Sequence, residues 1–87
     1  MSIVQNIILY NFVEVKIMYK RIRELREDKD LTQKKMAELI NCSQQVYSNY
    51  ELGQRDIPTD ILIKLSKIHD VSVDYILEIT NNMNINK

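Results

Sequence analysis

The sequence predicts an all-α fold of five short helices in one small domain. Glycine and proline each occur once among 87 residues, so few positions oppose a continued helix. From Met18 onward, apolar residues recur three and four positions apart, which is the spacing of an amphipathic helix. Residues that typically begin or end helices, among them Thr32, Ser43 and Gly53, fall between these apolar runs.

Residues 1–17 precede this pattern and differ from it. They are rich in β-branched and aromatic side chains, and Val13, Val15 and Ile17 alternate onto one face, which predicts extended chain. The stretch has no basic start and holds polar residues among its apolar ones, which argues against a signal peptide and a membrane span. Two interpretations remain open. Either the natural start is Met18 and the stretch has no role in the fold, or it is a strand that pairs with a second subunit.

The first two helices are defined by their apolar positions and by one cap. The first is expected over residues 18–29. The second lies between its N-cap Thr32 and Asn41, a residue that tolerates the left-handed conformation of a helix end. The positions expected on the inner faces are Ile22, Leu25 and Arg26 in the first helix, and Met36, Ala37 and Ile40 in the second.

The remaining three helices follow from similar signals. Ser43 caps the third, which ends at Gly53, and the link of about three residues from the second helix is typical of a helix-turn-helix. Pro58 suits the start of the fourth, where its missing N–H would be unpaired in any case, and Ser72 caps a short fifth. The expected core positions are Leu62, Leu65 and Ile68 or His69 in the fourth helix, and Tyr75, Ile76 and Leu77 in the fifth. Residues 80–87 have no apolar period and predict a frayed tail, so the expected segments are 1–17, 18–79 and 80–87.

The helix that begins at Ser43 has an unusual polar face. At about 100° per residue, uncharged polar side chains gather opposite Val46, Tyr47 and Tyr50. Solvated faces usually carry Lys and Glu, whereas amides and hydroxyls both donate and accept hydrogen bonds. Base edges in the DNA major groove also display donors and acceptors, and the leading residues of a recognition helix contact them. The predicted base contacts are Gln44, Gln45, Ser48 and Asn49.

Phosphate contacts are expected at the start of the second helix and at the edges of the third. A helix N-terminus offers free N–H groups and a partial positive charge, both of which favour phosphate oxygens. The predicted phosphate contacts are Gln33, Thr32, Lys34, Tyr47 and Arg55. Tyr47 is at the same time a candidate core residue, because it lies on the apolar face of its helix.

The charge distribution and the small number of reactive side chains exclude several classes of function. The net charge is zero, but residues 20–35 hold seven basic residues against four acidic ones, whereas residues 56–78 hold five acidic residues against two basic ones. The single cysteine, Cys42, allows no internal disulfide, which is typical of a reducing cytosol. A single histidine, His69, supplies neither a metal site nor a catalytic set. We therefore expect no enzyme, no metal, no cofactor, no small-molecule substrate and no membrane partner.

The run LTQKKMAELINCSQQVYSNYELGQRDIP, followed by LIKL and VSVDYIL, resembles the Cro and phage-repressor type of helix-turn-helix, the XRE family, over about residues 19–79. The resemblance implies a lambda-repressor-like five-helix domain in a cytoplasmic protein encoded by a bacterium or phage. It also implies that Gln33 contacts phosphate, that Gln44, Gln45 and Asn49 read bases with Ser48 nearby, and that Arg26 pairs with Glu51 to tie the first helix to the third. The sequence departs from the family pattern at His69, Asp70 and Gln54, which stand where a large apolar residue, Gly or Asn, and Lys are usual.

These observations lead to an expected function and one alternative. We expect a homodimeric transcriptional repressor that binds a double-stranded DNA operator, because one such module reads few base pairs and two half-sites restore specificity. The alternative is a protein-interaction module with the same fold, such as an antitoxin-like accessory subunit that docks through residues 1–17. The balanced charge and the missing loop lysine at Gln54 favour the alternative.

Overall fold

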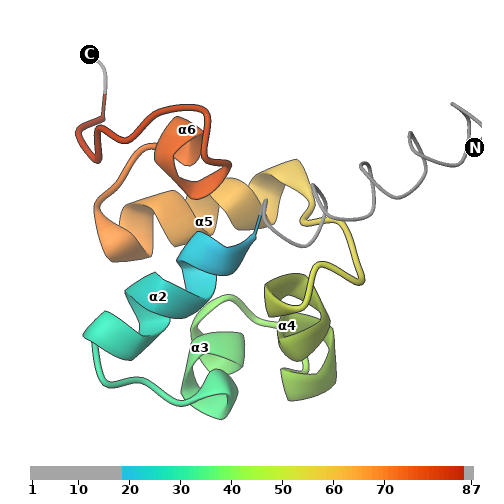
Figure 1. The fold of residues 1–87 in the computed structure, drawn as a ribbon. Helices are drawn as coiled ribbons and strands as arrows, with labels where there is room; N and C mark the ends of the chain where they lie inside the picture. Colours follow the sequence, from blue (N-terminus) through green and yellow to red (C-terminus); the bar gives the residue numbers. More distant parts are fainter. Residues whose placement is uncertain (1–18, 86–87) are drawn as a thin grey trace, which may run out of the picture.

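The protein is described here as a computed structural model that covers residues 19–85. Within that range it contains five helices and no strand, which confirms the all-α prediction. The helices are α2 (Lys20–Asp28), α3 (Gln33–Leu39), α4 (Gln44–Glu51), α5 (Thr59–His69) and α6 (Val73–Ile76). Figure 1 shows α2 across the middle of the molecule, with α5 and α6 on one side of it and α3 and α4 on the other. The expectation of an extended chain over residues 1–17 falls outside the described residues.

Three helices begin at the caps that the sequence predicts. The side-chain oxygens of Thr32, Ser43 and Ser72 accept hydrogen bonds from the backbone N–H three residues ahead, at 3.0, 3.1 and 3.0 Å. Pro58 occupies the N-cap of α5, so that helix begins at Thr59, one residue later than expected. The Ser43 cap places the start of α4 only a short turn after the end of α3 at Leu39.

All five helices in residues 19–85 end in one hydrogen-bonding pattern. A residue in the left-handed conformation is followed by a backbone N–H that donates to the carbonyl five residues back, at 2.9–3.2 Å. The left-handed residues are Asp30, Asn41, Gly53, Asp70 and Glu78, with φ between 55° and 70°. Asn41 and Gly53 are suited to this conformation, whereas for most other residues it costs roughly 1 kcal/mol or more. Only one of these five residues is a glycine, so what the helix ends share is the backbone hydrogen bond and not the residue type.

The core draws on every helix. The largest fully buried side chains are Tyr47, Ile22, Met36, Ile40, Leu65 and Ile76. Each aliphatic side chain of this kind contributes roughly 1.5–3 kcal/mol through its burial. Because these side chains form one cluster, α4 is fixed against α2 and α3 from its inner face.

The inner face of α5 agrees with the expected one at Leu65 and His69, and it differs at Ile61. Ile61, Leu65 and His69, four residues apart, are buried, whereas Leu62 and Ile68 are only partly buried. The buried face of α5 therefore begins one residue before the predicted Leu62, and of the two predicted alternatives at its end it uses His69 rather than Ile68. Both ring nitrogens of His69 are buried without a hydrogen-bond partner among the described residues.

Arg21 joins α2 to the C-terminal segment. One guanidinium nitrogen donates to the carbonyls of Tyr75 (2.7 Å) and Thr80 (2.6 Å), and the other donates to Asn81 Oδ1 (2.7 Å). The guanidinium carbon also lies 4.1 Å from the centre of the Tyr75 ring, a cation–π contact. Arg21 therefore satisfies carbonyls at and beyond the end of α6, and its charge is used within the fold.

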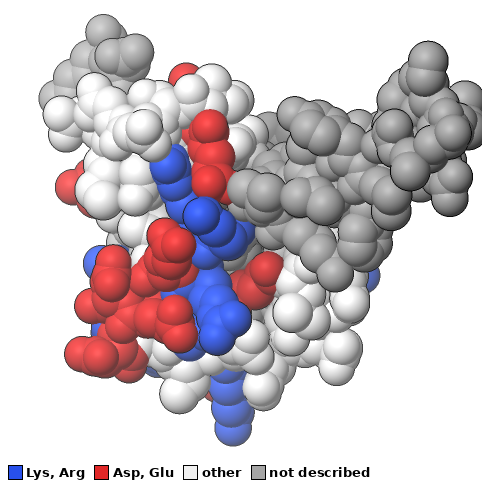
Figure 2. Space-filling model, in the orientation of Figure 1, with Lys and Arg blue, Asp and Glu red and all other residues white. Residues whose placement is uncertain are grey.

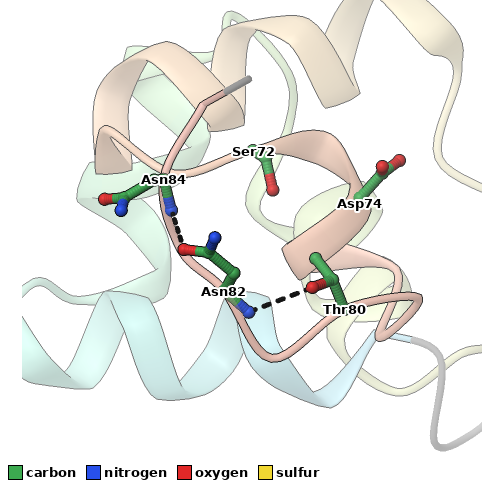
Figure 3. Close-up of a pocket in the computed structure, with 5 residues that line it drawn as sticks. All are labelled: Ser72, Asp74, Thr80, Asn82 and Asn84. Atoms are coloured by element: carbon green, nitrogen blue, oxygen red, sulfur yellow. Dashed lines mark hydrogen bonds between the residues drawn. The ribbon is translucent and has the colours of Figure 1, made fainter.

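Residues 80–85 fold back on the start of α6, where the sequence predicts a frayed tail. The Ser72 N–H donates to the Met83 carbonyl at 2.9 Å. Figure 3 shows two further turns of the segment, in which Asn82 N–H donates to Thr80 Oγ1 (3.1 Å) and Asn84 N–H donates to Asn82 Oδ1 (3.0 Å). Side-chain acceptors thus order this segment without the apolar period that sequence patterns rely on.

Candidate nucleic-acid interface

The outer face of α4 carries the four predicted base contacts. Gln44 and Gln45 are exposed, and Ser48 and Asn49 are partly exposed. The opposite side of the helix is buried, with Tyr47 at 0 % and Tyr50 at 3 % exposure. α4 thus presents a row of neutral donors and acceptors on its outer side, while the aromatic side chains of its inner side hold the helix against the core.

Two of these amides are bonded to each other. Gln45 Nε2 donates to Asn49 Oδ1 at 3.3 Å, across one turn of α4. Gln44 makes no side-chain hydrogen bond among the described residues. The outer face therefore presents one free amide at its leading end and one coupled pair behind it.

A buried ion pair holds α4 from its C-terminal end. Arg26 Nε and Nη2 donate to the two carboxylate oxygens of Glu51, at 2.7 and 3.3 Å, and Arg26 Nη1 donates to the Leu31 carbonyl at 2.7 Å. The side chains of Arg26 and Glu51 are 13 % and 2 % exposed. The structure thus brings together the pair that the resemblance implies, and it adds the loop between α2 and α3. The contact of Arg26 with Leu31 could not be predicted from the sequence, because every residue has a backbone carbonyl and residue type does not show which one is used.

Gln33 binds the same carboxylate. Its Nε2 donates to Glu51 Oε1 at 3.0 Å, so the amide expected at a phosphate is partly used inside the protein. Burial alone would raise the pKa of Glu51, but hydrogen bonding to the carboxylate, from Arg26 above all, outweighs it and lowers the pKa below its usual value. The end of α4 is therefore fixed by a carboxylate that binds Arg26 of α2 and Gln33 of α3, and Arg26 in turn binds the Leu31 carbonyl in the loop between them.

Tyr47 is not available for a phosphate contact. Its side chain is 0 % exposed, and its hydroxyl is buried without a hydrogen-bond partner among the described residues. Burial, followed by the nearby Glu51 carboxylate, raises the pKa of Tyr47 well above the usual value of a phenol. The expectation of a phosphate contact gives way to a core role, because the apolar face of α4 packs Tyr47 at the centre of the domain.

The other predicted phosphate contacts lie at the surface. Thr32 and Lys34 are exposed at the start of α3, and Arg55 is exposed in the loop after α4. The Thr32 hydroxyl accepts the capping bond from Lys35 N–H. Neither Lys34 nor Arg55 takes part in a salt bridge within residues 19–85. Lys34 and Arg55 are therefore exposed cations that no salt bridge within residues 19–85 engages.

The charges of α2 and α3 are more balanced. Arg23 lies 3.6 Å from Glu27, and Lys35 lies 4.0 Å from Glu38, with all four side chains more than half exposed. Figure 2 shows basic and acidic side chains side by side over α2, whereas the surface toward α4 is mostly free of charge. The basic surplus of residues 20–35 is thus partly compensated on the surface itself, and Arg21 is already bonded to the C-terminal segment.

Other kinds of site receive no support in the described part of the chain. Residues 19–85 hold no group of three or more His, Cys, Asp or Glu side chains that could bind a metal ion. None of their helices is long and apolar enough to span a membrane. Cys42 is partly buried, and burial raises the pKa of its thiol, which disfavours the reactive thiolate.

Comparison with known proteins agrees with this architecture. The profile of a family described as helix-turn-helix matches residues 22–76. The chain is 47 % identical over 58 residues to the HTH-type transcriptional regulator ImmR of Bacillus subtilis, covering 67 % of this chain and 46 % of ImmR. It is 40 % identical over 63 residues to the uncharacterized HTH-type transcriptional regulator YobD of the same organism, covering 72 % of this chain and 56 % of YobD. The chain spans about half the length of these curated relatives.

A solved structure has the same fold. The clp gene regulator ClgR from C. glutamicum superposes with a TM-score of 0.65 at 23 % sequence identity, over 75 % of this chain and 84 % of the other. At this identity the likeness concerns the arrangement of the helices alone.

Proposed function

Because the chain belongs to the XRE-type helix-turn-helix family, we propose that it is a small transcriptional regulator that recognises double-stranded DNA by sequence. The observation that carries this proposal is the uncharged amide face of α4, which is exposed at its leading end and partly exposed behind it, while the aromatic side chains opposite are buried and Glu51 is anchored. Such a face suits base edges, which present donors and acceptors but no net charge.

In this proposal α4 enters the major groove with its N-terminal end leading. Gln44 lies at that end, where it pairs with an adenine edge through one acceptor and one donor, while Gln45, Ser48 and Asn49 follow along the helix. The hydrogen bonds to Glu51 hold α4 at a fixed angle to α2 and α3 as it enters. Little rearrangement is then needed on binding, which favours affinity.

Phosphates on either side of the groove are contacted by the start of α3 and by the loop after α4. Free N–H groups at the start of α3 and the nearby Lys34 attract one phosphate, and Arg55 attracts another. Gln33 uses one amide hydrogen for Glu51 and retains a second for a phosphate oxygen.

The regulator acts as a homodimer in this proposal. One α4 helix reads only a few base pairs, and two copies on half-sites about one helical turn apart multiply that specificity. A dimer bound at an operator excludes other proteins from the same DNA, which is the action of a repressor. The site of action is the bacterial cytoplasm, where the DNA lies.

A protein-interaction module, such as an antitoxin-like subunit, is the second candidate. It is favoured by the balance of charge on α2 and α3, where Arg23 and Lys35 lie next to acidic residues. Gel filtration with and without residues 1–17, together with DNA capture at low salt, separates the two candidates. Retention of duplex DNA supports the first, and a stable protein complex with no DNA retention supports the second.

Two substitutions test the proposed DNA contacts. Gln44→Ala should weaken binding to a selected duplex by roughly 1–3 kcal/mol and leave binding to random DNA nearly unchanged. Lys34→Ala should weaken binding to all duplexes and reduce the slope of log K against log salt by about one. If both substitutions weaken every duplex equally, base reading by α4 is wrong.

A further inference from the structure

A polar hollow lies between the start of α6 and the C-terminal segment that folds back on it. Its volume is about 180 Å³, below the roughly 300–1,000 Å³ of pockets for drug-sized ligands, so it suits a molecule of only a few heavy atoms. The residues that line it are all polar: Ser72, Asp74, Thr80, Asn82 and Asn84. Figure 3 shows them around one space, with Asp74 at its edge. None of them belongs to the surface that the proposed function assigns to DNA.

Three side-chain oxygens of the hollow are held in place by backbone N–H groups. Ser72 Oγ accepts a hydrogen bond from Tyr75 N–H at 3.0 Å. Thr80 Oγ1 accepts one from Asn82 N–H at 3.1 Å, and Asn82 Oδ1 accepts one from Asn84 N–H at 3.0 Å. Each of these oxygens has a second lone pair. The hollow therefore offers several neutral acceptors at positions that the backbone fixes.

The charge of the lining favours a cation. Asp74 is the one charged residue that lines the hollow, and it takes part in no salt bridge within residues 19–85. An anion would meet this carboxylate, whereas a cation is attracted to it. A metal ion is poorly served, because the described residues hold no group of three or more His, Cys, Asp or Glu side chains that could bind one. A protonated primary amine carries one positive charge and three N–H donors, which match one carboxylate and several neutral oxygens.

We propose that this hollow binds a small primary amine in its protonated form. The ammonium group donates to the Asp74 carboxylate and to the neutral oxygens beside it. A hydroxyl or amide group on the same molecule pairs with the side-chain amides of Asn82 and Asn84. The bound amine joins residues 80–85 to the start of α6, and Arg21 continues the link to α2 through its bond to the Thr80 carbonyl. This inference goes beyond the proposed function, because it requires no DNA.

Titration of the full chain with ethanolamine hydrochloride at pH 7 and constant ionic strength tests the proposal, with backbone amide signals followed by NMR. The signals of residues 72–74 and 80–84 should shift together and saturate in the millimolar range. Tetramethylammonium chloride has the same charge but no N–H donor, so it should produce no saturating shift.

Three variants, each checked by thermal unfolding, assign the binding to the hollow. Asp74→Asn should weaken ethanolamine binding by about tenfold, the loss expected for a charged hydrogen bond. Asp60→Asn is the matched control, because Asp60 is also an exposed acid in the first turn of its helix but does not line the hollow. It should bind like the native protein. Asn82→Ala removes one acceptor and no charge, and it should weaken binding by about threefold, which keeps the test valid if Asp74→Asn does not fold.

Several outcomes would overturn the proposal. If ethanolamine shifts no signal of the hollow, the site is wrong. If tetramethylammonium produces the same shifts, or if Asp60→Asn weakens binding as much as Asp74→Asn, general attraction of cations to the protein explains the result. If calcium chloride saturates the same signals at a lower concentration than ethanolamine, the hollow binds a metal ion and not an amine.

Discussion

His69 should make the fold sensitive to mild acid. Its side chain is 6 % exposed, and neither ring nitrogen has a hydrogen-bond partner among the described residues. Burial, with a smaller effect from the nearby Lys29, lowers the pKa of His69 from 6.5 to about 4. The folded protein therefore binds a proton less readily than the unfolded chain. Stability is fully present above pH 6.5 and is lost as the pH falls toward the folded-state pKa.

The size of the effect follows from the two pKa values. For pKa values of 6.5 unfolded and about 4 folded, the free energy of unfolding falls by about 2 kcal/mol between pH 7 and pH 5. In a domain of this size that corresponds to roughly 10 °C in melting temperature. The pKa of the Glu51 carboxylate is lowered from 4.5, so the stability that Glu51 contributes is lost mainly below that pH and outside this window.

Urea unfolding followed by circular dichroism at pH 7, 6 and 5 measures this loss, and His69→Met provides the matched control. The variant keeps a side chain of similar size and removes the titrating ring, so its stability should be nearly constant over the same range. His69 is the sole histidine of the 87 residues, which leaves no second imidazole to confuse the result. Equal losses in the native protein and in His69→Met, or an imidazole that titrates near 6.5 in the folded protein by NMR, would refute the reasoning.

Three further substitutions test other parts of the fold, each by chemical unfolding at pH 7. Arg26→Ala leaves the Glu51 carboxylate buried without its partner and should cost about 3–5 kcal/mol; a cost under 1 kcal/mol would contradict the anchoring role. Tyr47→Phe removes a buried hydroxyl that has no partner, so stability should stay the same or rise by about 1 kcal/mol, and a loss above 1 kcal/mol would reveal a hydrogen bond. Asp70→Gly relieves a left-handed backbone at an exposed position and should add roughly 0.5–1 kcal/mol, whereas a decrease would show that the carboxylate contributes to the helix end.

Local sequence signals predict the helices well but not all of their ends. Thr32, Ser43 and Ser72 are recognisable as caps because their side chains make the capping bonds themselves. Glu78 is not recognisable as a left-handed residue, since its conformation results from the carbonyl bonds of the preceding helix rather than from its own preference.

In the candidate interface, too, some side-chain positions can be predicted from the sequence and others cannot. The outward position of Gln44 and Gln45 follows from helical periodicity, which also predicts that Tyr47 faces inward. The bond from Gln33 to Glu51 joins residues 18 apart in sequence, and it depends on the packing of α3 against α4. Pattern reasoning assigns Gln33 to a phosphate by default, because it sees a helix start but not the carboxylate beside it.

Because Glu51 is the last residue of α4, a small rotation of the helix about its ion pair produces a larger displacement at the other end. Gln44, at the opposite end, lies seven residues away, or about 10 Å at 1.5 Å per residue. A pivot of only about 10° at the carboxylate would swing the amide of Gln44 through roughly 2 Å, more than the tolerance of a hydrogen bond to a base edge. Under the proposed function, sequence discrimination would depend on the Arg26–Glu51 contact, about 10 Å from the amide that reads the base. Weakening that contact should then reduce the preference between bases and leave the attraction to phosphates unchanged.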